Sequence, residues 1–131
     1  MFNYFVIAFV VFDLFLVIFI VYRRSKRGIA SSLRKVIHDQ WMMIHNETDT
    51  RYAVLQADKL LDIALKAYGY QGSLGDKLKK AEPLFSNIDR VWNAHKVRNR
   101  VAHELDFKVD VRLRNECLRA FEQAFKDLKA L

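Results

Sequence analysis

One uninterrupted apolar stretch constrains this chain more than any other feature. Residues 4 to 22, "YFVIAFVVFDLFLVIFIVY", carry a single charged side chain, that of Asp13. A stretch of this length matches the roughly 20 residues that cross a bilayer as an α-helix, and the tyrosines at its two ends suit the membrane interface. A signal peptide would need a basic start, a shorter apolar core and small residues before a cleavage site. The sequence therefore predicts an uncleaved transmembrane anchor over residues 1–22.

Basic residues directly after the anchor predict its orientation. Arg23, Arg24, Lys26 and Arg27 supply four positive charges in five residues, whereas no Lys or Arg precedes the apolar stretch. The positive-inside rule then places the N-terminus outside and the following domain in the cytoplasm, as expected for a single-pass protein of the cell (inner) membrane. We expect residues 23–28 to form a linker whose basic side chains contact anionic lipid headgroups.

Asp13 is the exception within the anchor. A carboxylate in the middle of a bilayer costs on the order of 3 kcal/mol, so it should be protonated, paired or turned toward another helix. Two interpretations stay open: a contact that helps the anchor to dimerise or bind a partner, or a lone acid tolerated in a very apolar helix.

The composition of the remaining chain excludes several kinds of site. From Gly28 onward, 18 Lys and Arg stand against 14 Asp and Glu, which makes the domain only mildly basic. The single cysteine, Cys117, excludes an intramolecular disulfide and has the spacing of a buried apolar residue. His38 and His45 would lie roughly 10 Å apart along a helix, too far to share one metal ion easily. We therefore expect neither a metal nor a cofactor.

Apolar residues recur at helical spacing through most of the domain, and no run alternates as a strand would. Residues suited to begin helices interrupt this pattern: Asp49 or a neighbouring threonine, Ser73 with Asp76, Ser86 with Asp89, and Asp110. Gly69 is suited to end one. The sequence thus predicts an all-α antiparallel bundle of four to five helices over residues 29–131, preceded by the transmembrane helix.

Polar and basic side chains are concentrated in "WNAHKVRNRVAHELDF", residues 92 to 107. On a helix that starts near Asn87, the polar side chains of His95 and Asn99 fall on the expected core stripe, together with Ile88, Val91, Trp92 and Ala102. Arg98 and His103 differ by about 140° around such a helix and by about 7.5 Å along it. They can therefore meet only at a helix end or across a two-fold interface between two copies.

The segment from Arg98 to His103 resembles the signature of the HEPN superfamily, an arginine with an adjacent polar residue and a histidine a few residues later. The flanking residues and "ADKLLDIALKAYGY" upstream are similar to bacterial HEPN sequences, including small membrane-anchored ones, over most of residues 38–130. The resemblance implies a HEPN-like bundle that forms a homodimer with a metal-independent endoribonuclease site. Arg98 and His103 would be the catalytic pair and Asn99 their polar helper. His95 and Arg100 match no required position and remain supporting candidates.

These residue types suit RNA cleavage without a metal. Histidine can move protons near neutral pH, and arginine binds phosphate through two donors without losing its charge. Such an enzyme would be a toxin or a stress or defence effector, with RNA as substrate and an antitoxin-type protein as partner. The alternative is a non-catalytic, membrane-anchored interaction module in which the same side chains form a structural cluster at a dimer interface.

The orientation of the anchor is directly testable. Protease added to intact cells should spare a C-terminal epitope tag, because the domain after the basic cluster is expected to lie inside. The tag should be lost only after the membrane is permeabilised, as followed by immunoblotting. Digestion in intact cells would contradict the predicted topology.

Overall fold

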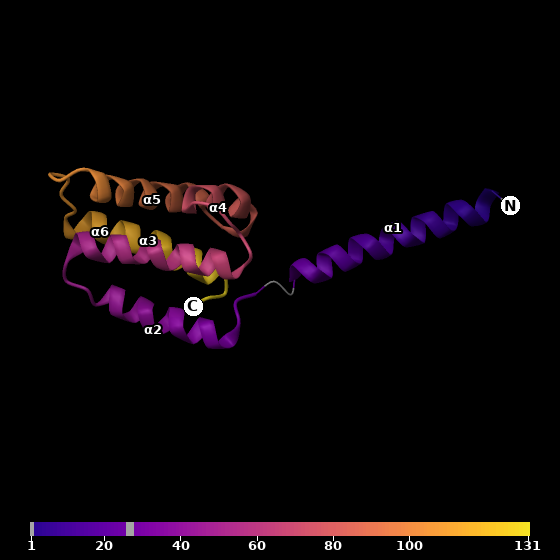
Figure 1. Cartoon of the computed structure of the whole chain (residues 1–131), viewed down its shortest axis with the longest axis horizontal. Coiled ribbons are helices and arrows are strands. Elements are labelled where there is room, and N and C mark those ends of the chain that lie inside the picture. The colour runs from indigo at the N-terminus through magenta and orange to yellow at the C-terminus, as the bar shows by residue number, and fades with distance from the viewer. Residues whose placement is uncertain (1, 26–27) are drawn as a thin grey trace.

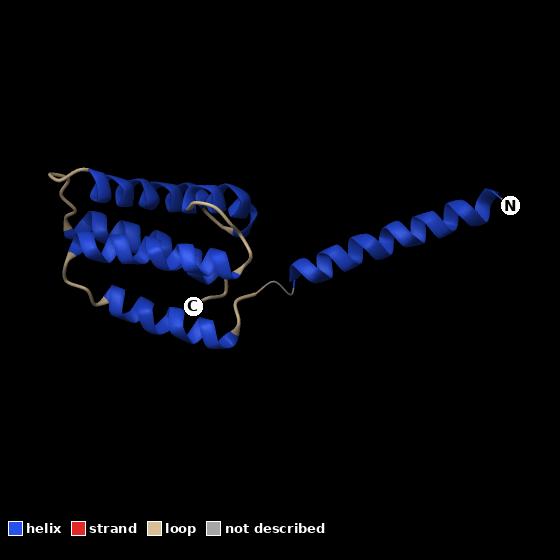
Figure 2. Cartoon of the chain, in the orientation of Figure 1, coloured by secondary structure: helices blue, strands red, loops and turns tan. Residues whose placement is uncertain are grey.

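A computed structural model describes residues 2–25 and 28–131, and every regular element within these ranges is helical. Figure 2 shows helices joined by loops, with no strand in the described part of the chain. The all-helical prediction is confirmed. In chain order the elements are α1 (Phe2–Ser25), α2 (Ser31–His45), α3 (Thr50–Ala67), α4 (Leu74–Ala81), the 3-10 turn η1 (Glu82–Leu84), α5 (Ile88–His103) and α6 (Val111–Asp127).

Helix α3 is the centre of the bundle. The long helices α2, α3, α5 and α6 run in alternating directions, and α4 with η1 connects α3 to α5 (Figure 1). Helix α3 packs against α2, α4, α5 and α6. The largest fully buried side chains come from several of these helices, for example Ile37, Leu61, Phe121 and Phe125. Burying such side chains is the main stabilising contribution to a bundle of this size.

Most of the predicted helix ends are confirmed. Asp49 accepts hydrogen bonds from the backbone amides of Arg51 and Tyr52 at the start of α3. Ser73 and Asp76 form a reciprocal capping box on α4, and the hydrogen bonds from Ser73 lower the pKa of Asp76. Asp110 caps α6, and Gly69 follows α3 with a φ of +95°, a conformation that favours glycine.

The expected cap of α5 is wrong by one residue. Asn87, not Ser86, accepts the hydrogen bond from the backbone amide of Arg90. Ser86 instead donates from its backbone amide and its hydroxyl to the carboxylate of Asp127, at 2.8 and 2.9 Å. The local sequence permits either residue as cap, and the contact with α6 decides between them.

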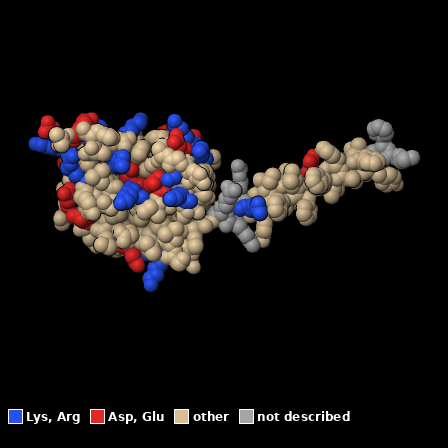
Figure 3. Space-filling model, viewed as in Figure 1, with Lys and Arg blue, Asp and Glu red and all other residues tan. Residues whose placement is uncertain are grey.

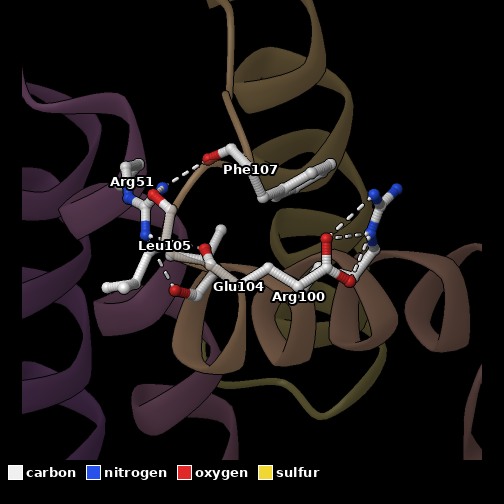
Figure 4. Close-up of polar contacts among 6 residues, drawn as sticks. Arg51, Arg100, Glu104, Leu105 and Phe107 are labelled. Atoms are coloured by element: carbon white, nitrogen blue, oxygen red, sulfur yellow. Dashed lines mark hydrogen bonds and ion pairs between the residues drawn. The ribbon is translucent and has the colours of Figure 1, made fainter.

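Two arginines cap helix C-termini from neighbouring helices at one end of the bundle. Arg51, on α3, donates to the carbonyl of Val101 at 2.9 Å and also to those of Glu104, Leu105 and Phe107 in the loop after α5 (Figure 4). Arg114, on α6, donates to the carbonyls of His45 and Glu47 after α2, at 2.6 and 3.1 Å. The last carbonyls of a helix lack partners within it, so each arginine satisfies acceptors that would otherwise be unpaired.

Helix α1 differs from the other helices because it is almost entirely apolar and yet is not buried in the protein. Residues Asn3–Arg23 form a stretch of 21 residues with mean hydropathy 3.0, long and apolar enough to span a membrane, and none of the apolar window is buried in the protein. Asp13 lies exposed near its middle, and α1 is otherwise uncharged up to Arg23 (Figure 3). The helix continues through Ser25, so residues 23–25, expected as linker, are helical. Lys26 and Arg27 lie outside the described residues.

Removal of the Arg51 cap should destabilise the bundle. Arg51→Met leaves carbonyls of the α5–α6 loop without donors, which should lower the free energy of unfolding by about 1–3 kcal/mol. The matched control is Arg112→Met, because the Arg112 side chain is 87% exposed and its polar partner among the described residues is Glu116 on its own helix. The control should cost less than about 0.5 kcal/mol. Urea denaturation of the full chain in neutral detergent measures both, and equal losses would argue against the capping role.

Candidate functional site

A buried carboxylate lies at the centre of the candidate site. Asp58 is on α3 and is 2% exposed, between the core residues Val54 and Leu61. His95, on α5, faces it and is 9% exposed. A carboxylate is stable in such a place only when cations or hydrogen-bond donors compensate for the lost water.

The partners of Asp58 belong to a closed ring of four side chains, which we call the Asp58 ring: Asp58, His95, Asn99 and Arg98. Nδ1 of His95 lies 2.8 Å from Oδ1 of Asp58, and Nε of Arg98 lies 3.2 Å from Oδ2, as an ion pair rather than an aligned hydrogen bond. Nη1 of Arg98 donates to Oδ1 of Asn99 at 3.0 Å. The amide nitrogen of Asn99 lies 3.5 Å from Nε2 of His95 and completes the ring.

The chemistry of each group gives the ring a direction. An ionised carboxylate only accepts, so Nδ1 of His95 is the donor to Asp58. Nε2 of a neutral imidazole is then an acceptor, and the Asn99 amide is the donor that faces it. This leaves the Asn99 oxygen to accept from Arg98. Each side chain therefore orients the next, and Asp58 holds Arg98 and His95 in place together.

The ring forms one wall of an open cavity of about 650 Å³ between α3, α5 and the loop before α4. Lys59 and Asp62 line it from α3, and Gly72 and Ser73 from the loop. Gly72 has a φ of +101°, and a Cβ there would lie 2.9 Å from a carboxylate oxygen of Asp76. Only glycine is therefore accommodated at this point of the cavity wall without displacing the cap of α4.

The structure brings together only some of the predicted site residues. Arg98 and Asn99 lie in the ring and on the cavity, and His95, a supporting candidate, joins them there. His103 is the last residue of α5, is exposed and does not line this cavity. Arg100 lies elsewhere, where it pairs with Glu104 at 3.1 Å and its guanidinium lies 3.9 Å above the Phe107 ring (Figure 4).

The expected core stripe of α5 is correct at His95 and wrong at its end. Ala102 is exposed and Val101 is buried instead, while Asn99 is half-buried. The buried residues of the helix are Val91, Ala94, His95 and Val101. Arg98 consequently lies closer to the core than the sequence pattern indicated.

Asp58 is the site residue that the sequence analysis missed. A usable signal was present, because Asp58 falls between Val54 and Leu61 on the apolar stripe of its helix. A charged residue on a core stripe requires a partner on a neighbouring helix. Lys77 is a second buried charge in the structure: it is 4% exposed, and its Nζ lies 2.6 Å from Oδ1 of Asp62.

Two other kinds of chemistry find no support among the residues that the structure describes. Among the described residues, no group of three or more His, Cys, Asp or Glu side chains is placed to hold a metal ion. Burial raises the pKa of the Cys117 thiol to about 12, so it stays protonated at neutral pH and is a poor nucleophile.

The arrangement of the Asp58 ring is suited to binding an anion beside a fixed arginine and a fixed imidazole. No protein-family profile, curated protein or solved structure matches this chain. What the site can do is therefore argued from its side chains alone.

The ring should behave as an energetically coupled unit. Asp58→Ala and His95→Ala each leave a buried polar partner unpaired, so each should cost about 3 kcal/mol or more of unfolding free energy. The double variant should cost about 1–3 kcal/mol less than the sum of the two, because the second change removes a partner already lost. Urea denaturation measures all three. The exposed pair Glu122 and Lys126 is the control cycle, with an expected coupling of about 0.3–0.5 kcal/mol.

Proposed function

We propose that this chain is a membrane-tethered, metal-independent endoribonuclease of the HEPN type. Arg98 holds the phosphate as negative charge develops on it, His103 transfers protons, and Asn99 keeps Arg98 in place. The observation that carries the proposal is the fixation of Arg98: Asp58 and Asn99 hold its guanidinium, while the side chain remains 37% exposed on an open cavity. A cation that is held before the substrate arrives loses little freedom when the phosphate binds.

The active site in this proposal is shared by two copies of the chain. Arg98 and His103 lie on the same helix and are separated by about 7.5 Å along it. His103 is exposed and has no polar partner among the described residues, so it is available to a second copy. A symmetric homodimer that packs through the face of residues 87–103 would bring Arg98 of one copy toward His103 of the other.

Helix α1 is the membrane anchor in this proposal. Its length and hydropathy fit one crossing, and the basic cluster after it favours the inner membrane with the bundle in the cytoplasm. Confinement of the chain to a surface raises its local concentration and so favours the dimer. The biological role that fits is a toxin or a stress or defence effector, controlled by an antitoxin-type protein.

A second candidate function is a non-catalytic interaction module. It is favoured by the closure of the Asp58 ring, since all four side chains already find partners within one copy of the bundle. A buried polar network that closes within one copy can stabilise a fold without contributing to any reaction.

Cleavage of RNA in the absence of metal decides between the two functions. The full chain in neutral detergent should cut single-stranded RNA in excess EDTA, as followed by gel electrophoresis. His103→Ala should reduce the rate at least about a hundredfold, the usual scale for a lost acid–base group. Arg98→Ala should do the same through the lost phosphate contact. Arg100→Ala should lose much less, because Arg100 is paired with Glu104.

Thermal unfolding separates chemistry from stability in these variants. His103 is exposed and makes no hydrogen bond to the described residues, so His103→Ala should leave the melting temperature unchanged. Arg98→Lys keeps a cation beside Asp58 and tests whether the planar guanidinium is needed. Cleavage that survives in His103→Ala would contradict the catalytic assignment. An intact chain that cuts no RNA would favour the interaction module.

A further inference from the structure

The cavity beside the Asp58 ring contains two carboxylates, and both are already compensated. Asp58 contacts His95 and Arg98. The carboxylate of Asp62 lies 2.6 Å from Nζ of Lys77, whose side chain is only 5% exposed. Neither carboxylate therefore needs a further cation, and neither presents an uncompensated negative charge to a ligand in the cavity.

Two cationic groups on the same cavity keep donors that the protein does not use. Lys59 lines the cavity from α3, is exposed, and forms no ion pair with any described residue. In Arg98, Nε faces Asp58 and Nη1 donates to Asn99, whereas Nη2 has no partner within the described chain. These unused donors come from two different helices and line one open space.

The size and the other walls of the cavity suit a nucleotide. Its volume of about 650 Å³ is in the usual range for small-molecule sites. Leu55 and Leu74 supply apolar surface next to the polar wall, and an apolar surface of this kind can cover a sugar or a base. A phosphate at the cationic wall would leave the remaining ligand over these leucines.

We propose that this cavity is a phosphate-binding subsite for a ribonucleotide, in which Lys59 and Arg98 hold one phosphate group within a single copy of the chain. The inference rests on the proposed function, because it names Lys59 as a second contact for the RNA that Arg98 holds. The Asp58 ring orients Arg98 so that Nη2 remains for the ligand. The site is complete in one copy, unlike the pairing of Arg98 with His103.

Binding of adenosine 5′-monophosphate tests this subsite, because an endonuclease cannot cut this ligand. Isothermal titration calorimetry on the full chain in neutral detergent should detect binding that weakens as salt is raised. Lys59→Ala should weaken it at least about tenfold, the scale of one charge-assisted hydrogen bond. Lys96→Ala is the matched control, since Lys96 is an exposed lysine on α5 that does not line the cavity, and it should leave binding unchanged.

Further ligands identify the chemical group that is recognised. Adenosine, which lacks the phosphate, should bind far more weakly than its monophosphate. Glycerol 3-phosphate represents a lipid headgroup, and equal affinity for it would overturn the assignment to a ribonucleotide. Equal losses in Lys59→Ala and Lys96→Ala would overturn the assignment to this cavity.

The result is also distinguishable from a failure of the proposed function. RNA cleavage without binding of the monophosphate would overturn the subsite and leave the endoribonuclease in place. If the chain binds the monophosphate through Lys59 but cuts no RNA, the result would support the subsite and contradict the proposed endoribonuclease activity.

Discussion

The buried carboxylate of Asp58 is the constraint on which the candidate site depends. A charge with 2% exposure on the central helix must be compensated from a neighbouring helix, and α5 supplies both compensating groups one turn apart, in His95 and Arg98. This requirement fixes the rotation of α5 about its own axis relative to α3. The same rotation brings Arg98 and Asn99 onto the cavity and leaves His103, at the end of the helix, exposed. A structural need in the core thus also determines which polar groups of α5 are presented to a ligand.

Arginines satisfy a second requirement at one end of the bundle, where loops join the helices. Arg51 and Arg114 each occupy the start of one helix and cap the end of another. Because Arg51 binds carbonyls directly after His103, it also limits how far the end of α5 can move (Figure 4). The position of His103 relative to the bundle is therefore held from α3, as is the position of Arg98. Both members of the proposed catalytic pair depend on the same central helix.

Sequence patterns predicted the features of this fold that are local. Helical periodicity, Asp49, the Ser73–Asp76 capping box and Gly69 all act within a few residues, and the structure confirms each of them. The choice between Ser86 and Asn87 as cap of α5 depends on Asp127, 41 residues from Ser86, and was predicted wrongly. The Asp58 ring spans 37 residues between Asp58 and His95 and was missed for the same reason. Spacing within one helix indicates which residues share a face, but it does not identify the partner across the helix interface.

The membrane anchor restricts how two copies can share a site under the proposed function. For Arg98 of one copy to meet His103 of the other, the two α5 helices must run in opposite directions across the two-fold axis. Both copies must also remain tied to one membrane, through a connection of residues 26–30 that spans at most about 18 Å. Helix α5, with 16 residues, is about 24 Å long. If the bundles stood upright on the membrane, the point where α1 joins the bundle would lie too far from the membrane in one of the two copies. Bundles that lie along the membrane, with the two-fold axis perpendicular to it, satisfy both conditions. The shared site would then lie between the two bundles, on the axis that relates the two anchors.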